Sequence, residues 1–221
     1  GPRAGRVGRE ELMAAACRLM SAQGSVDISI HEIAHEAGMS SALIKYHFGH
    51  KDGLFLAILE KVIGDSLQRL QQLVERPLPP AEKLRLHIEG VLNICWRHPY
   101  VNRLMHHLLS TGQDARERVS LNFIKPLLAA QARILREGER AGAFRHVDPT
   151  HLHFLVIGAC DHLFFGHYAL RHALGLSELS EGLRQRYAQD LVSTILHGIE
   201  KESPPVHSNG GHAVAAPLLI D

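Results

Sequence analysis

Apolar residues recur every three or four positions along most of this chain, which is the period of an amphipathic helix. Glycines, prolines and capping residues bound the predicted helices, which cover about residues 9–23, 30–37, 41–48, 51–76, 81–97, 100–110, 115–139, 151–174 and 183–200. No segment shows the alternation of apolar and polar residues that is typical of a half-buried strand. The sequence therefore predicts an all-α protein, with a kink at Pro126. The last segment, residues 201–221, is rich in proline, glycine and small residues and is expected to be disordered.

Two short helices and a tight turn fit into the stretch that begins at Ser29. Ser29 and Glu32 have the spacing of a capping box, so a helix is expected directly after this serine. Gly38 follows where a left-handed residue would end that helix, and either Ser40 or Ser41 can cap the next one. This layout is typical of a helix-turn-helix, whose second helix lies in the DNA major groove.

The charge balance is unusual for a DNA-binding protein. The chain has a formal net charge of +1, and residues 1–52 contain as many acidic as basic side chains. The basic surplus is local, because residues 37–51 contain two lysines and no carboxylate. Histidines near DNA phosphates could add positive charge, namely His31, His35, His47 and His50. We expect modest, salt-sensitive affinity for each DNA half-site.

Several classes of protein lack support in the sequence. The three cysteines lie far apart and form neither a metal pattern nor a disulfide framework. No apolar run approaches the roughly 20 residues that span a bilayer, and no signal peptide opens the chain, so we expect a cytoplasmic protein without a membrane partner. No motif for a catalytic nucleophile, a phosphate-binding glycine loop or a zinc protease is present, so neither an enzyme nor a cofactor is predicted.

The 17 histidines raise the question of a metal site. Only His31 and His35 have the i, i+4 spacing that places two ligands on one helix face. Both lie on the first helix of the helix-turn-helix, where solvent exposure is the simpler interpretation. No dedicated metal site is predicted.

The helices that begin at His151 and Leu183 carry apolar residues on more faces than one buried stripe requires. The extra positions are Leu155, Val156, Ala159, Leu163, Leu191, Val192, Ile195 and Leu196. They could belong to the internal core of one subunit, or they could pack against a second copy. We favour a two-fold homodimer, because paired reading helices then meet half-sites about one DNA turn apart.

A set of residues in the N-terminal part has the identities and spacing of a known DNA-binding domain. They are Ala16, Leu19, Gly24, Ser29, Ile33, Ala34, Ala37, Gly38, Ser40, Tyr46, His47, Phe48, Lys51, Asp52 and Leu54. In these positions the chain resembles TetR-family repressors. The resemblance implies a three-helix DNA-binding domain over residues 1–52 and a larger helical ligand-binding and dimerisation domain over residues 53–200. Residues 148–152 and 161–162 are somewhat similar to the pyrimidine-utilisation regulators of that family.

The expected DNA contacts follow from this resemblance. Ser40, Tyr46 and Lys51 are assigned to phosphates, and Ser41, Ala42 and Lys45 are assigned to bases, with His47 as a further contact. Many family members carry tyrosine where this chain has Lys45. A lysine can reach a guanine edge as well as a phosphate, so the operator sequence cannot be transferred from relatives. Tyr46 could instead be a packing residue and Lys45 a solvated one.

The resemblance also implies a small-molecule effector, of unknown identity, inside the C-terminal helices. The residues expected to line its cavity are Trp96, Asn102, His106, Asn122, Phe123, Cys160, Asp161, Phe164 and Tyr168. Asp161 stands among apolar residues, where a carboxylate is costly unless it is paired. An arginine or histidine at the dimer surface could be its partner instead of an effector. The resulting hypothesis is a homodimeric, effector-controlled repressor on a palindromic double-stranded operator, and the alternative is a dimeric helical scaffold without an operator.

Overall fold

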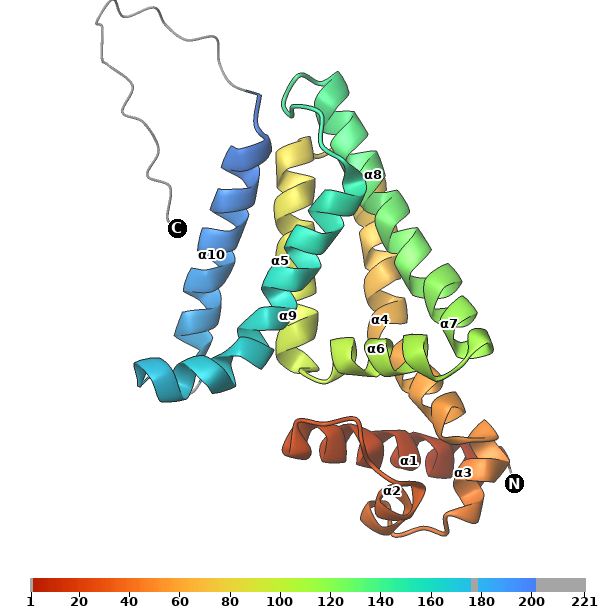
Figure 1. The fold of residues 1–221 in the computed structure, drawn as a ribbon. Helices are drawn as coiled ribbons and strands as arrows, with labels where there is room; N and C mark the ends of the chain where they lie inside the picture. Colours follow the sequence, from red (N-terminus) through yellow and green to blue (C-terminus); the bar gives the residue numbers. More distant parts are fainter. Residues whose placement is uncertain (1, 176–178, 202–221) are drawn as a thin grey trace, which may run out of the picture.

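The computed structural model describes residues 2–175 and 179–201 and is all-helical over them, as the hydrophobic period predicts (Figure 1). Its only strand-like pairing in this part of the chain is an isolated bridge between Phe144 and Glu200. The predicted disorder of the C-terminal segment lies outside the described residues, apart from Lys201. No helix in the described ranges has the length and apolar content that a membrane span requires.

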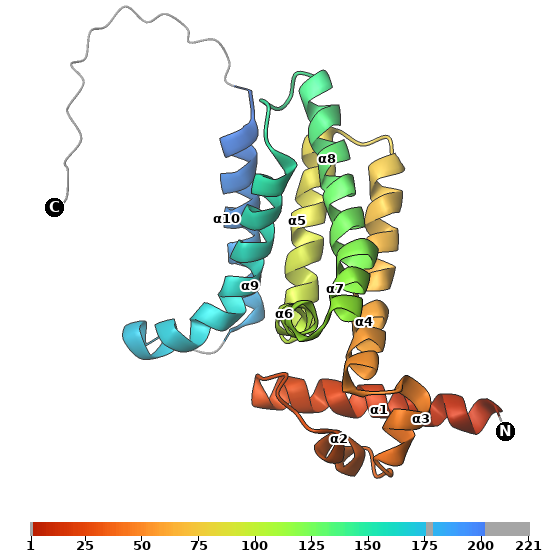
Figure 2. The same ribbon diagram turned by 45° about the vertical axis from the view of Figure 1, so that its right-hand side comes forward.

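The first three helices, α1 (Pro2–Gln23), α2 (Ile30–Glu36) and α3 (Ala42–Phe48), form a small unit at one end of the molecule (Figures 1 and 2). Fully buried Leu12, Met20, Ile33 and Ile44 hold these helices together. Helix α1 starts seven residues earlier than the predicted helix that began at residue 9. The early turns have no apolar stripe to reveal them, although Arg6 and Glu10 form an i, i+4 ion pair there.

Helix α4 (Lys51–Glu75) leaves this N-terminal unit and runs into the larger bundle, so it belongs to both (Figures 1 and 2). The bundle continues with α5 (Pro80–Arg97) and α6 (Val101–Thr111). Helix α6 lies crosswise between the N-terminal unit and the rest of the bundle and packs against α4 (Figure 1). A rearrangement of α6 would therefore displace contacts with α4, the helix that connects the N-terminal unit to the bundle.

The predicted single helix over residues 115–139 is divided in the structure. It consists of α7 (Gln113–Val119), a π-helical turn (Ser120–Ile124) and α8 (Lys125–Arg140). In the π turn, the Lys125 amide donates to the Ser120 carbonyl five residues earlier. Pro126 follows immediately, and its missing amide hydrogen removes one helical bond, so the expected interruption takes the form of a π turn.

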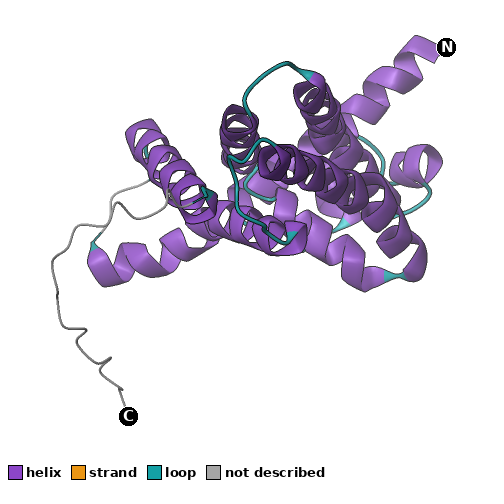
Figure 3. Cartoon of the chain, turned by 90° about the horizontal axis from the view of Figure 1, so that it is seen from above, coloured by secondary structure: helices purple, strands orange, loops and turns teal. Residues whose placement is uncertain are grey.

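The last two helices, α9 (Pro149–Leu174) and α10 (Glu181–Ile199), stand on one side of the bundle, as the view from above shows (Figure 3). The Asp148 side chain caps α9 by accepting from the Thr150 amide at 2.7 Å, so the helix begins at Pro149, two residues before the predicted start at residue 151. Because α9 packs on α5 and α8, and α10 packs on α5, parts of the proposed dimer face are used inside the subunit. Val156, Val192 and Ile195 are buried there, so their assignment to a dimer face is wrong. Leu155 remains 60% exposed, and its neighbour Phe154 is 69% exposed.

Candidate nucleic-acid interface and effector region

The capping box predicted for α2 is present. The Glu32 amide donates to Ser29 Oγ at 3.1 Å, and the Ser29 amide donates to Glu32 Oε2 at 2.7 Å. The hydrogen bonds from Ser29 lower the pKa of the Glu32 carboxyl. Gly38 then ends the helix with φ of +63°, a conformation that favours glycine. These local contacts set the direction in which the chain leaves α2 and enters α3.

Helix α3 is held by one face and presents another. The N-cap residue is Ser41, which makes no side-chain cap bond, while Ser40 Oγ accepts from the Ala42 amide at 3.3 Å. Ile44 is buried, and Leu43 and Phe48 pack against the core. The face opposite to these residues is formed by Ala42, Lys45 and Tyr46, which are all exposed, Tyr46 by 80%. The packing interpretation of Tyr46 is therefore wrong, and Lys45 is accessible to a ligand.

Two other predicted DNA contacts have intramolecular partners. His47 is half-buried, and its ring lies edge-on to Tyr46 and Phe48, with centroid distances of 4.9 and 6.1 Å. The Lys51 ammonium donates to the Ile28 carbonyl at 3.0 Å and lies 5.4 Å from the centroid of the Phe55 ring. Lys51 thus ties the start of α4 to the loop before α2, a structural role that motif spacing did not reveal.

Salt bridges explain how a neutral N-terminal unit can still present a basic face. Arg18 binds Glu11 at 2.9 Å and Glu36 at 2.8 Å, and the Glu32 carboxylate is occupied by the capping box. Glu10 is paired with Arg6, and none of these four acidic groups belongs to α3, which itself contains no carboxylate. The net charge of the domain is therefore a poor guide to the charge of this surface.

Helices α4 and α6 are joined by a polar contact that the sequence analysis missed. His107 Nε2 lies 3.2 Å from Asp52 Oδ1, and the His107 ring lies edge-on to Phe55 at a centroid distance of 5.4 Å. Asp52 and Phe55 stand in the first turns of α4, directly after α3. A movement of α6 thus has a direct contact through which it can act on the N-terminal unit.

Seven of the nine residues expected to line an effector cavity lie on α5, α6 and α9, and four of these seven form two side-chain contacts. Asn102 donates to Asp161 Oδ1 at 3.0 Å, so this carboxylate has an amide partner within the subunit. Nearby on the same helices, the rings of Trp96 and Phe164 pack edge to face at 5.8 Å. Asn102 also reaches Cys95 Sγ at 3.5 Å, and burial, with a smaller effect of Asp161, raises the pKa of Cys95 to about 12. We call Trp96, Asn102, Asp161 and Phe164 the α5–α6–α9 cluster.

The other five predicted lining residues are not part of this cluster, and they differ in their exposure to solvent. Cys160 is fully buried, and burial raises the pKa of its thiol, while Phe123 is part of the core. His106 on α6 and Asn122 in the π turn are both exposed. The side chain of Tyr168 lies outside the described part of the chain. A single cavity that gathers all nine residues stays a prediction.

A buried polar chain in the bundle was also missed. Gln131 is completely buried on α8, and its Nε2 lies 2.9 Å from His87 Nε2 on α5. Its Oε1 lies 3.2 Å from His153 Nδ1 on α9. Since the amide nitrogen must donate, His87 Nε2 is the acceptor, and burial lowers the pKa of His87 to about 4. The signal in the sequence was only a pair of histidines and a glutamine on apolar faces.

Within the described ranges, no three histidine, cysteine or acidic side chains gather as a metal site would require. His31 and His35, the one pair with suitable helical spacing, are both exposed on α2. The candidate site consists of the exposed face of α3 at one end of the molecule and the α5–α6–α9 cluster within the helical bundle.

Two family models match this chain. A family model described as bacterial regulatory proteins of the tetR family matches residues 12–58, and a tetracyclin repressor-like C-terminal domain model matches residues 77–203. The transcriptional regulator BetI of Brucella anthropi is 31% identical over 180 residues, which cover 81% of each chain. BetI of Brucella canis is 37% identical over 76 residues, which cover 34% of this chain and 38% of that protein.

Solved structures have the same fold at low sequence identity. A TetR/AcrR-family regulator from Thermobifida fusca has a TM-score of 0.62 and 21% identity, over 86% of this chain and 97% of that one. FadR from Bacillus subtilis, solved in complex with stearoyl-CoA, has a TM-score of 0.63 and 18% identity, over 83% and 97%. An N-terminal helix-turn-helix followed by a helical C-terminal domain defines a class of transcription regulators. The chain belongs to the TetR family, whose members are regulators of transcription and not enzymes.

Proposed function

We propose that this protein is an effector-controlled repressor that binds a palindromic DNA operator as a homodimer in the cytoplasm. The observation that carries the proposal is the exposed, acid-free face of α3, formed by Ala42, Lys45 and Tyr46 over a buried Ile44 anchor. An anchored helix with one free face of this kind suits insertion into the major groove. We divide the chain into a DNA-binding part, residues 1–52, and a ligand-binding and dimerisation part, residues 53–200, with α4 continuous across the division.

In this proposal each exposed residue has a defined role. Lys45 and Ala42, with Ser41 beside them, face the bases, while Tyr46 and Ser40 contact phosphates. His47 and Lys51 stabilise α3 and the start of α4 through their intramolecular contacts. Lys51 uses one ammonium hydrogen for the Ile28 carbonyl, so two hydrogens can still contact a phosphate. A lysine that reaches a base edge is worth about 1–3 kcal/mol of discrimination.

Dimer formation is assigned to the outer side of α9 and α10. Phe154 and Leu155 are large apolar side chains that remain exposed on α9, and exposed apolar patches of this kind mark interaction sites. Replacing Phe154 and Leu155 with aspartate should turn the dimer into a monomer, as measured by light scattering after gel filtration. A wild-type monomer at micromolar concentration would refute the homodimer.

Effector control is assigned to the α5–α6–α9 cluster, which offers aromatic rings beside an amide and a carboxylate. This mixture suits a lipid-like, aromatic or heterocyclic molecule with one polar group. Its signal would pass through α6 to the His107–Asp52 contact and so to α4 and the reader. The stearoyl-CoA of the FadR complex belongs to that protein and does not identify this effector.

The test is fluorescence anisotropy with DNA from the upstream region of the protein's own gene, titrated at several salt concentrations with competitor DNA. We expect competitor-resistant binding by wild type, a loss of about tenfold to hundredfold for Lys45→Ala, and unchanged binding for Lys125→Ala, an exposed lysine on α8. If wild type binds all duplexes equally, or if both variants behave alike, the scaffold without an operator becomes the better interpretation.

A further inference from the structure

A second candidate site lies at the C-terminal end of α4, whereas α3 precedes the N-terminal end of the same helix. A pocket of about 510 Å³ is lined there by the C-terminal end of α4, the turn that follows it, α5 and α8. Its lining residues are Val74, Glu75, Arg76, Pro77, Lys83, Arg133, Arg136, Glu137 and Arg140. Helix α4 has 25 residues and is therefore about 35 Å long, so this pocket lies well away from DNA held at α3.

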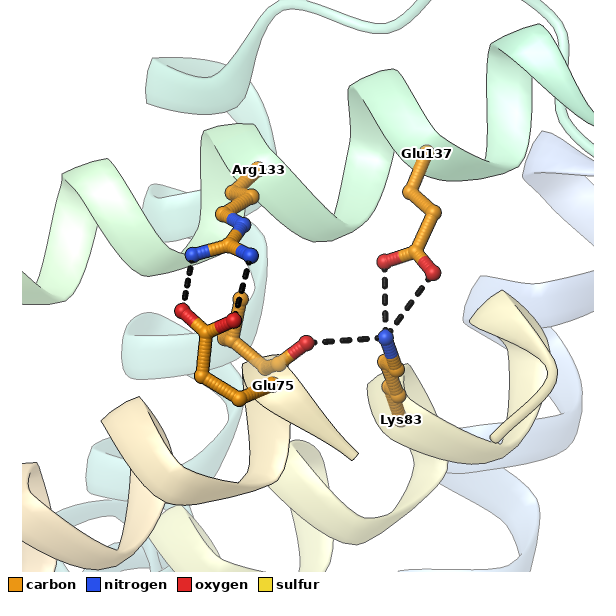
Figure 4. Close-up of polar contacts among 5 residues, drawn as sticks. Glu75, Lys83, Arg133 and Glu137 are labelled. Atoms are coloured by element: carbon orange, nitrogen blue, oxygen red, sulfur yellow. Dashed lines mark hydrogen bonds and ion pairs between the residues drawn. The ribbon is translucent and has the colours of Figure 1, made fainter. Parts of the chain in front are cut away.

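Two internal ion pairs neutralise part of the lining (Figure 4). Arg133 binds Glu75 through two hydrogen bonds, one of them 2.7 Å long. The Lys83 ammonium, whose side chain is only 3% exposed, donates to both Glu137 oxygens at 2.9 and 2.8 Å and to the Val74 carbonyl at 2.8 Å. All three Lys83 hydrogens are thus used, and both carboxylates of the pocket are paired.

Three arginines remain after this pairing. Arg76, Arg136 and Arg140 form no ion pair with any carboxylate among the described residues, and they leave the pocket with three surplus positive charges. The whole chain has a net charge of only +1, so this surplus is concentrated here. Arg136 and Arg140 are four residues apart on α8, and like charges at that spacing repel each other. The C-termini of α4 and α8 offset a part of this repulsion through their helix dipoles.

We propose that this pocket binds a small phosphorylated anion with at least two phosphate groups. Guanidinium groups bind phosphate through paired hydrogen bonds, and three of them can contact two neighbouring phosphates. The pocket volume is within the range of small-molecule sites. The Lys83 and Arg133 pairs hold α4, α5 and α8 in place around it, so the site is formed before the ligand arrives. This proposal is independent of the effector site assigned above.

The probe is inorganic pyrophosphate, titrated into the full-length protein by calorimetry at constant ionic strength. The test variant is Arg136→Gln/Arg140→Gln, because both side chains are exposed and can change without disturbing the core. The matched control is Arg69→Gln/Arg97→Gln, which removes the same charge from exposed positions outside the pocket. Thermal unfolding of each variant checks that the fold is retained.

We expect saturable binding of one pyrophosphate per chain, weakened at least tenfold in the pocket variant and less than twofold in the control. Equal weakening in both variants would mean general charge attraction and would overturn the site. Absence of binding would also overturn the site, and the arginines would then serve only to interact with the dipoles at the C-termini of α4 and α8. Further titrations use an oligoglutamate peptide and phosphatidylcholine vesicles that contain phosphatidic acid. Tighter binding to either one than to pyrophosphate would replace the small anion by an acidic protein or a lipid headgroup.

Discussion

The buried chain of His87, Gln131 and His153 makes the stability of this protein sensitive to acid. His87 Nε2 accepts a hydrogen bond from the Gln131 amide, and protonation would set a donor against a donor in the core. Burial, with a smaller effect of His153, lowers the pKa of His87 from about 6.5 to about 4. His153 can keep its own bond when protonated, because its Nδ1 donates to Gln131.

The sign and size of the effect follow from proton linkage. The unfolded chain takes up a proton at His87 as the pH falls below about 6.5, while the folded chain resists until about pH 4. The stabilisation is therefore fully present above pH 6.5 and is lost progressively as the pH falls through this window. With about 1.4 kcal/mol per pKa unit, the loss between pH 7.5 and pH 4.5 is about 2.5 kcal/mol.

The measurement is the free energy of unfolding in urea at these two pH values, for wild type and for His87→Gln. A glutamine oxygen can still accept from Gln131, but it does not titrate, so the variant should lose about 2.5 kcal/mol less than wild type on acidification. His106→Gln, a change at an exposed histidine, serves as control and should follow wild type. The reasoning is refuted if His87→Gln and wild type lose the same amount. A difference in the free energy of unfolding between His87→Gln and wild type that is the same at both pH values does not affect the argument.

Further predictions concern two helical glycines, the Ser29 cap of α2 and the Lys51 side chain. A Cβ on Gly138 would lie 2.0 Å from the Phe144 ring, so Gly138→Ala should cost more than 2 kcal/mol in thermal unfolding. Gly90→Ala meets nothing within 4 Å and should stabilise by about 0.5–1 kcal/mol, and a similar effect of both alanines would contradict the packing argument. Ser29→Ala removes the α2 cap and should lower stability by about 1 kcal/mol, whereas no change in urea unfolding would mean that water replaces the cap. Lys51→Ala should both weaken binding to every DNA sequence and lower the melting temperature through the lost bond to Ile28, and a melting temperature equal to wild type would show that bond to be unimportant.

Local patterns were enough for most of the architecture. The helix positions, the Ser29–Glu32 capping box, the Gly38 stop and the Asp148 cap depend on residues within about four positions of each other, so the linear sequence contains the relevant information. The exposed face of α3 follows for the same reason, because helical period alone separates Ile44 from Lys45 and Tyr46. The family resemblance then gave these local features a function.

Contacts between distant segments could not be read in this way. Val156 and Val192 carry the same apolar signal whether they face their own bundle or a second subunit, and only the packing of α9 and α10 on α5 places them inside. The His87–Gln131 bond and the Lys83–Glu137 pair join residues 44 and 54 positions apart, and no periodicity records such partners. Burial, pKa and the charge of a pocket depend on all the groups that fold around a side chain. They are therefore properties of the packed helices, whereas helix location is a property of neighbouring residues.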